Sequence, residues 1–333
     1  MKSFINLSKL VITFTVLLIL LPNFSLAFSQ QVRCADVADR GHLNVLTINL
    51  LFSEVKDRED RLETIANFID EQRAEGEPVD IVFSQEVVGG PLSGTINSSL
   101  DLKALLAERG MRYNLHYRLA NGLPGFLTVG NAILSRCKIL FTVSKTLPFV
   151  SEEPFEDFEI PLRRKVMMSR IKVPNFGEIN AYNTHLCAFC DAEERLEQTY
   201  VLLEFIENVE DFIRGENPII LGGDFNANLN IDDDWEVYEQ ITLDCGFIDT
   251  YSTANNCTNC CSEDEGYEDY DGCTFAVTDN PYAINPFTGQ TEDPKRIDYI
   301  FVKGMETDSS NVVFNSDPWV SDHSGVLTRI DLH

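Results

Sequence analysis

The segment Pro218-Ile-Ile-Leu-Gly-Gly-Asp-Phe-Asn226 runs from an apolar stretch directly into two polar side chains. Its first five residues, 218–222, predict a buried strand. Asp224 and Asn226 follow at the point where this strand ends, and polar residues at strand ends of α/β proteins face the usual ligand crevice. The segment therefore predicts both a central strand and part of a functional site.

Two strand-helix-strand units surround this segment. Residues 43–48 and 79–84 predict buried strands, and between them the apolar residues at helical spacing are Leu62, Ile65, Ala66, Phe68 and Ile69. Residues 178–183 and 218–222 form a second unit, around a helix that carries Leu196, Tyr200, Leu203, Ile206 and Val209. Shorter strand-like runs follow Asn131, Lys138, Val166, Ile297, Asn311 and Val326. These are too many strands for one doubly wound sheet, so we expect two packed sheets with outer helices.

The composition is that of a globular protein with a sizeable core, but it is strongly acidic. The 333 residues are 44% hydrophobic and 24% charged, and 53 Asp and Glu against 26 Lys and Arg give a formal net charge of −27. A disordered or collagen-like chain is therefore excluded. The average field of such a protein repels phosphate polyanions, although local basic spots can still bind phosphate.

The first 27 residues have the features of a secretory signal peptide. Lys2 and Lys9 precede the apolar run 10–21, and Ser25-Leu-Ala27 supplies small residues for cleavage. An uncleaved anchor is the weaker alternative, because the run is shorter than the roughly 20 residues of a spanning helix. We expect a secreted or periplasmic protein with a signal peptide at 1–27, a lead-in at 28–42 and one domain at 43–333.

Nine cysteines follow the predicted cleavage point, and in an oxidising compartment most of them should form disulfides. The sequence leaves their pairing open, and the odd count leaves one thiol free or intermolecular. A thiolate zinc site at Cys187-Ala-Phe-Cys190 or at the cluster 257–273 is the alternative. That cluster belongs to a Cys-rich, acidic insertion at about 249–293, which lacks periodicity. Its loop 262–272 is expected to be solvated, and whether it binds Ca²⁺ is open, because the spacing does not satisfy an EF-hand.

Polar residues recur where predicted strands end. The set comprises Asn49, Glu86, His185, Asp224, Asn226, Asp298, Asp322 and His323. One such residue would be ambiguous, but together they predict an oxygen-rich site for a hard cation such as Mg²⁺, with Zn²⁺ less favoured by these ligand types. Two histidines beside the ion would serve proton transfer and charge stabilisation during attack at phosphorus.

The order of these motifs resembles that of the endonuclease/exonuclease/phosphatase superfamily, which has the DNase I-like fold. The resemblance rests on Thr47-Ile-Asn49, Gln85-Glu86, Gly130-Asn-Ala-Ile-Leu-Ser-Arg136, Asn183-Thr-His-Leu186, Gly223-Asp-Phe-Asn226, Arg296-Ile-Asp-Tyr299 and Ser321-Asp-His323. It runs from about residue 43 to the C-terminus. It implies an α/β fold, a four-layer α/β/β/α sandwich with two mixed sheets, and makes 43–333 a catalytic domain.

The resemblance also implies roles for the strand-end residues. Glu86 would bind the metal, with Asn49 and Asp322 close to it. Asp224 would orient or deprotonate the attacking water, and Asn226 would hold this water and a phosphate oxygen. His323, paired with Asp298, would be the general base or charge stabiliser, and His185 would face the phosphate. Which of Asp224 and His323 takes the proton stays open.

Within the superfamily, the sequence looks most similar to secreted neutral sphingomyelinases. The features that carry this likeness are the form of the 130–136 motif, Lys165-Val166, the residues after His323 and the connection through 279–287. The resemblance implies an Mg²⁺-dependent phosphodiesterase, with Mn²⁺ or Co²⁺ as substitutes, that splits sphingomyelin into ceramide and phosphocholine at a membrane surface. Lys165 would then contact the phosphate. A secreted DNase I-like endonuclease acting on nucleic acid and a sugar or inositol phosphate phosphatase are the alternatives, and no obligate protein partner is evident.

Overall fold

The first sheet is built around two parallel strands, which the chain connects through helix α3 (Arg58–Ala74). Its spatial order is β13 (Glu306–Val313), β14 (Gly325–Asp331), β1 (His42–Asn49), β2 (Ile81–Gly89), β4 (Leu127–Ser135) and β3 (Asn114–Leu123). All neighbouring strands in this sheet are antiparallel except β1 and β2.

The computed structural model describes residues 34–53, 57–149, 152–155, 158–160, 162–215, 217–261, 272–284 and 289–332.

The second sheet repeats this arrangement, with α5 (Ala192–Ile213) connecting its two parallel strands. Its spatial order is β11 (Ile248–Asp249), β12 (Asp298–Lys303), β10 (Ile219–Asp224), β9 (Gly177–His185), β8 (Lys165–Val173) and β5 (Lys138–Thr146). The remaining neighbours pair antiparallel. The two predicted strand-helix-strand units are therefore β1-α3-β2 and β9-α5-β10.

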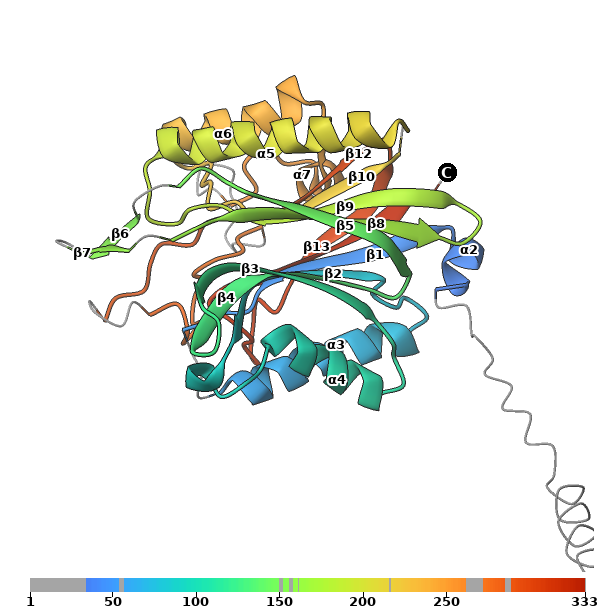
Figure 1. The fold of residues 1–333 in the computed structure, drawn as a ribbon, viewed down its shortest axis with the longest axis horizontal. Coiled ribbons are helices and arrows are strands. Elements are labelled where there is room, and N and C mark those ends of the chain that lie inside the picture. Colours follow the sequence, from blue (N-terminus) through green and yellow to red (C-terminus); the bar gives the residue numbers. More distant parts are fainter. Residues whose placement is uncertain are drawn as a thin grey trace, which may run out of the picture. The chain divides into compact units, whose positions relative to one another are not determined.

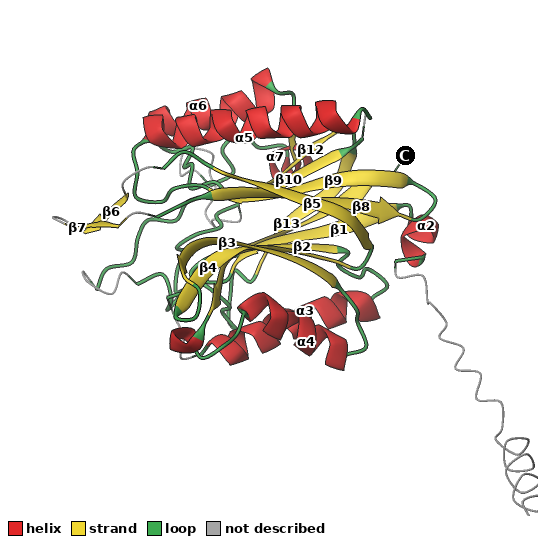
Figure 2. Cartoon of the chain, viewed as in Figure 1, coloured by secondary structure: helices red, strands yellow, loops and turns green. Residues whose placement is uncertain are grey.

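The two sheets pack face to face, and helices cover their outer faces (Figures 1 and 2). Helices α3 and α4 (Ser98–Glu108) lie on the first sheet, and α5 and α6 (Trp235–Glu239) lie on the second. This is the expected four-layer α/β/β/α sandwich, so the predicted fold class is confirmed. The shorter elements are α2 (Asp36–Arg40), α7 (Thr250–Asn255) and the hairpin of β6 (Glu152–Phe155) and β7 (Phe158–Ile160).

Alternation along the strands divides the core into three layers. Between the sheets lie side chains such as Phe83, Ile220 and Ile300. The neighbour of Ile220, Leu221, points the other way and packs in the layer that contains Leu202 of α5. A third layer joins α3 and α4 to the first sheet. Because both faces of the central strands are covered, successive residues of β1 and β10 are all buried. Each fully buried apolar side chain contributes about 1.5–3 kcal/mol.

Eight of the nine cysteines form disulfides. The pairs are Cys34–Cys137, Cys187–Cys190, Cys257–Cys260 and Cys261–Cys273. Cys245 is a half-buried free thiol. The cysteines that could have formed a zinc site are therefore paired with one another. The predicted signal peptide and residues 262–271 of the acidic loop lie outside the described residues, and within the described part no helix is long and apolar enough to cross a membrane.

The insertion at 249–293 begins with a buried ion pair and not with loop structure. Arg296 is completely buried, and its Nη2 donates to Asp249 Oδ1 at 2.6 Å. Its guanidinium also lies over the rings of Tyr251 and Tyr299. Asp249 in turn accepts the backbone N–H groups of Tyr251 and Ser252 and so caps α7. The pair thus joins the insertion to β12.

Asp249→Ala should lower the free energy of unfolding by about 3–5 kcal/mol, because it leaves the buried Arg296 charge uncompensated. Equilibrium urea unfolding measures this. The matched control is Asp70→Ala, which removes the exposed pair with Arg73 and should cost less than about 1 kcal/mol. A loss for Asp249→Ala no larger than for the control would contradict the structural role of the pair.

Candidate functional site

Strand register brings three predicted residues side by side. On the β9–β10 ladder His185 lies opposite Asp224, and on the β10–β12 ladder Asp224 lies opposite Asp298. Residues opposite one another share a face of the sheet. Gly223 makes this approach possible, since its φ is +145° and a Cβ there would lie 2.1 Å from the carbonyl oxygen of Thr184. The segment 218–226 therefore supplies both the strand and the centre of the site.

Asp224 is almost fully buried and surrounded by donors from both sheets. Its Oδ2 accepts Asn49 Nδ2 at 3.0 Å and lies 3.3 Å from His185 Nε2 and 3.7 Å from His323 Nε2. Its Oδ1 accepts the backbone N–H of Asn226 at 3.0 Å. Asn49 ends β1 of the first sheet, so Asp224 is the carboxylate at which the two sheets meet.

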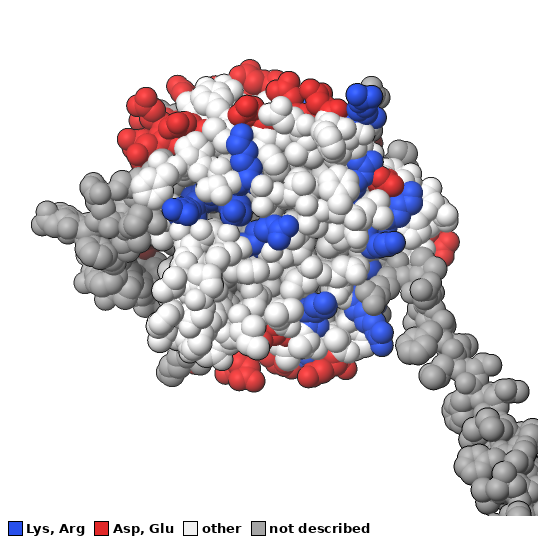
Figure 3. All heavy atoms as spheres, in the orientation of Figure 1, with Lys and Arg blue, Asp and Glu red and all other residues white. Residues whose placement is uncertain are grey.

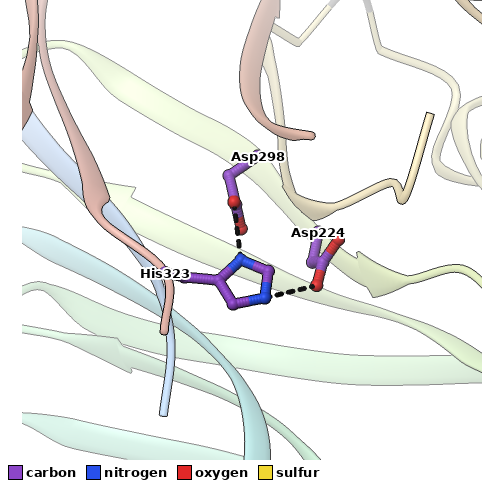
Figure 4. Close-up of side chains that lie close together, drawn as sticks. All are labelled: Asp224, Asp298 and His323. Carbon is purple, nitrogen blue, oxygen red and sulfur yellow. Dashed lines mark hydrogen bonds and ion pairs between the residues drawn. The ribbon is translucent and has the colours of Figure 1, made fainter. Parts of the chain in front are cut away.

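His323 lies between two carboxylates, Asp298 and Asp224 (Figure 4). Its Nδ1 is 2.8 Å from Asp298 Oδ2, while Nε2 faces Asp224. Ligand atoms of these three residues lie within 4.8 Å of one another. Asp298 thereby orients the imidazole, in the way that a carboxylate commonly fixes a catalytic histidine.

The segment Cys273-Thr-Phe-Ala276 supports this pair, and sequence reasoning missed it. Thr274 Oγ1 accepts the backbone N–H groups of both Ile297 and Asp298. The Phe275 ring packs edge-on against the imidazole of His323, with centroids 4.8 Å apart. The backbone N–H of Ser324 donates to the carbonyl of Thr274, and that of Ala276 to the carbonyl of Asp322. No sequence signal marked these residues, because they lie in an aperiodic stretch.

Glu86 and Asp322 form a second group of carboxylates beside Asp224. Glu86 lies within an irregularity of the β2–β4 pairing and has a φ of 53°, a left-handed conformation that is uncommon for non-glycine residues. Its Oε2 accepts the backbone N–H of Phe52 at 2.8 Å. Asp322 Oδ1 accepts the Ser321 hydroxyl at 3.0 Å. Burial raises the pKa of Glu86, and the charge of Asp322 raises it further.

Mutual repulsion and burial dominate the electrostatics of the site. Burial, then the charge of Asp298, raises the pKa of Asp224 to about 7. Burial also raises the pKa values of Glu86 and Asp322, and the charge of Asp322 raises the pKa of Glu86 further. Burial alone would lower the pKa of His323, but the Asp298 and Asp224 carboxylates outweigh it and raise this pKa well above its usual value. Burial, Arg164 and His323 lower the pKa of His185, so this ring is neutral.

These residues fit a divalent cation. Asp224 and Asp298 are buried, Glu86 and Asp322 are half-buried, and Asp298 Oδ1 has no hydrogen-bond partner among the described residues. Asn49 Oδ1 accepts only the backbone N–H of Leu51 and keeps a lone pair. Oxygen donors of this kind are the ligands of Mg²⁺. Asp298 and Asp224 each have an oxygen facing a ring nitrogen of His323. The predicted metal ligands Glu86, Asn49 and Asp322 do not share their oxygens with this ring, so they are better placed to bind the cation.

Of two residues predicted to contact the phosphate, Asn226 lies beside Asp224, whereas the amine of Lys165 is directed away towards β5. Asn226 has a φ of 51°, and its Nδ2 donates to the carbonyl of Leu186 at the end of β9, beside Asp224. Lys165 begins β8 next to β9, but its Nζ donates to Thr146 Oγ1 at 3.1 Å on the far neighbour, β5. Its neighbour Arg164 is buried, and its charge acts on Glu86 and His185. The cation whose charge reaches these site residues is therefore Arg164.

Comparisons with known proteins agree with this geometry. A family model described as the Endonuclease/Exonuclease/phosphatase family matches residues 46–323. No curated protein matches the chain. Solved structures that resemble it include an endonuclease/exonuclease/phosphatase family protein from Leptotrichia buccalis, at 22% identity and a TM-score of 0.60, covering 87% of this chain and 99% of that one.

Two further structures show how varied proteins of this fold are. A mannosyl-6-phosphatase from Bacteroides thetaiotaomicron has 18% identity and a TM-score of 0.57, with 86% of this chain and 99% of that chain covered. D. rerio TDP2 complexed with a single-strand DNA product has 17% identity and a TM-score of 0.56, with 87% and 99% covered. At such identities the likeness concerns the fold.

Thr274→Val should lower the turnover number by about tenfold or more while changing KM little. The substitution keeps the shape but leaves two backbone N–H groups unsatisfied, which costs about 1–3 kcal/mol in a buried site and frees Asp298 to shift. Steady-state kinetics on any turned-over substrate, with thermal unfolding alongside, measures both effects. Thr274→Ser retains the acceptor oxygen and should restore turnover; equal defects in the Val and Ser variants would refute the positioning role.

Mg²⁺ should stabilise the protein more at about pH 8 than at about pH 5. The pKa of Asp224 is raised from 3.8 to about 7, so between these values the folded state keeps a proton that the unfolded chain has lost. Without metal, the free energy of unfolding therefore falls as pH rises through this window, and above it the charged carboxylate can be offset by a cation.

Thermal unfolding in EDTA or Mg²⁺ at both pH values tests this dependence. Asp224→Asn cannot acquire the charge, so it should flatten the pH dependence and reduce the gain from Mg²⁺. The same Mg²⁺ gain in wild type at both pH values would rule out this account.

Proposed function

Because this chain belongs to the endonuclease/exonuclease/phosphatase family and is therefore a metal-dependent phosphoesterase, we propose that it cleaves a phosphodiester by attack of water at phosphorus. The observation that carries this proposal is the Asp298–His323–Asp224 arrangement next to the carboxylates Glu86 and Asp322. A nucleophilic water, a proton acceptor and a cationic group are what such a displacement requires.

The pKa directions suggest how the chain's own residues share this work. The pKa of Asp224, at about 7, suits a group that accepts a proton from water near neutral pH. His323 holds its proton at that pH and would donate a charged hydrogen bond to the phosphoryl group, while Asp298 keeps the ring in place. His185, neutral, would donate to a phosphate oxygen. A bound divalent cation would polarise the phosphoryl oxygens and offset the carboxylate charge.

Sphingomyelin is the substrate that the sequence resemblance predicts, with ceramide and phosphocholine as products. It remains the first lipid to test. Nucleic acid is a second candidate, and it is favoured by a group of cations beside the site, described below, that have no acidic partner within the described part of the chain. We further propose that the protein acts in an extracytoplasmic compartment, secreted or periplasmic, because its four disulfides need oxidising conditions.

Glu86→Gln should lower turnover by at least about a hundredfold without unfolding the protein, because it removes a carboxylate from the proposed cation site. EDTA should abolish wild-type activity and added Mg²⁺ should restore it. The matched control is Glu71→Gln, an exposed position on α3. Near-normal turnover of Glu86→Gln would show that Glu86 is not needed for the reaction. Activity that survives thorough chelation would show that the metal is not needed.

The same preparation separates the substrates. Phosphocholine release from sphingomyelin vesicles, nicking of plasmid DNA and free phosphate from sugar phosphates are measured in one buffer. Phosphocholine alone would support the sphingomyelinase proposal. Nicking or free phosphate without phosphocholine would exclude it in favour of a nuclease or a phosphatase.

A further inference from the structure

Positive charge gathers on one face of this acidic protein. Figure 3 shows Asp and Glu concentrated over the helical layers at the top and bottom of the view, and Lys and Arg over the strands between them. The acidic character of the top layer comes from α5, which carries seven acidic residues and one arginine. The formal charge of −27 therefore does not describe the field over the sheet edges.

Three cations on these strands form what we call the basic cluster: Arg118, Arg163 and Lys165. Arg118 lies on β3, and its Nη2 reaches Thr142 Oγ1 of β5 at 3.4 Å. Arg163 and Lys165 lie at the start of β8, where Lys165 bonds to Thr146 of β5. The cluster thus spans the edges of both sheets, where β3 faces β5 and β8.

The cluster lacks negative partners. Among the described residues, none of the three cations forms an ion pair with an Asp or Glu, and the side-chain contacts of Arg118 and Lys165 are to neutral hydroxyl groups. Partial burial and the charges of Arg118 and Arg163 together lower the pKa of Lys165, so the three cations repel one another. In a chain with about two acids for each base, such an arrangement is unfavourable unless an anion offsets it.

The cluster begins one strand away from the proposed site. The carbonyl oxygen of Lys165 accepts Asn131 Nδ2 and lies 3.5 Å from Thr184 Oγ1, next to His185. The β8–β9 ladder, with Met167 opposite Asn183, places the start of β8 beside the end of β9. An anion on the cluster would therefore be a neighbour of a phosphate at His185 and Asp224.

Asn121 holds this part of the cluster in place. Its Oδ1 accepts the backbone N–H of Arg163 at 2.5 Å, and its Nδ2 donates to the carbonyl of the same residue at 2.6 Å. A residue of β3 thus fixes the chain that leads into β8. The cations are attached to ordered backbone on both sheets, which lowers the entropic cost of binding an anion between them.

We propose that the basic cluster binds a second phosphate group of the substrate, adjacent in the same molecule to the phosphate that is cleaved. This inference rests on the proposed phosphodiesterase function and narrows its substrate class. Successive phosphates occur along a nucleic-acid strand, whereas in sphingomyelin a choline cation flanks the single phosphate and would be repelled by the cluster. The cluster therefore favours the nucleic-acid candidate over sphingomyelin.

A titration with inorganic pyrophosphate, in EDTA and at low ionic strength, tests the cluster as an anion site independently of catalysis. Arg118→Gln and Arg163→Gln should each weaken pyrophosphate binding by about tenfold, the size expected for one charged contact. The matched control is Lys145→Gln on β5, whose ammonium already pairs with Glu204 at 3.3 Å and should leave binding unchanged. No binding to wild type, or equal binding by all four proteins, would overturn the proposal.

A pair of chromogenic diesters tests whether the anion site belongs to the substrate. These are thymidine 3′-(4-nitrophenyl phosphate) with and without a 5′-phosphate. Wild type should show a lower KM for the 5′-phosphorylated diester with a similar turnover number, and that advantage should fall with added salt. Both arginine variants should lose the advantage and the Lys145→Gln control should keep it. A wild-type KM that is the same for both diesters would overturn the substrate role.

Three further outcomes are distinguishable. Failure of wild type to hydrolyse either diester, together with no phosphocholine release from sphingomyelin, would count against the phosphodiesterase function, while the pyrophosphate titration still decides the anion site. Failure on both diesters with phosphocholine release would overturn the substrate role of the cluster. If the arginine variants lost adsorption to phosphatidylglycerol vesicles but bound pyrophosphate as wild type does, the cluster would be a membrane-adsorbing surface and the proposal would be wrong.

Discussion

The repulsion among carboxylates is the constraint around which the site is built. Asp224, Asp298, Glu86 and Asp322 come from four separate segments, and the first two are buried while the other two are half-buried. Such a concentration of charge is costly, and the protein offsets part of it locally. His323 is placed between two of the carboxylates, Asn49 donates to Asp224, His185 Nε2 lies 3.3 Å from Asp224 Oδ2, and backbone N–H groups approach Glu86 and Asp224. The remaining deficit of positive charge is what makes the site receptive to a cation.

The fold makes this concentration possible because two repeats of one unit pack face to face. In each sheet a helix connects two parallel strands, so their carboxyl ends lie at the same edge. The interface between the sheets brings Asn49 from one repeat to Asp224 of the other. Antiparallel strands then add Asp298 and the segment with His323. Residues far apart in the sequence become neighbours through register alone.

Much of this could be predicted from the sequence, and the exceptions have a common cause. The strands and helices around residues 43–84 and 178–226 were predictable because burial on both faces makes their apolar patterns strong. The strand-end residues were predictable because register places them at one edge. Thr274, Phe275 and the buried Arg296–Asp249 pair were not, since they act through tertiary contacts in a stretch without periodicity. The family resemblance implies that Lys165 contacts the phosphate, but it does not reveal that the amine of this residue turns towards β5.

The segment that supports His323 also links the reactive centre to the redox state of the protein's surroundings. Residues 273–276 are tied to the rest of the insertion by the Cys261–Cys273 bond, and two of them contact the imidazole or the backbone that carries Asp298. In a reducing cytosol this bond cannot persist. Reduction of this bond would therefore remove the covalent anchor of the segment that packs against the imidazole of His323.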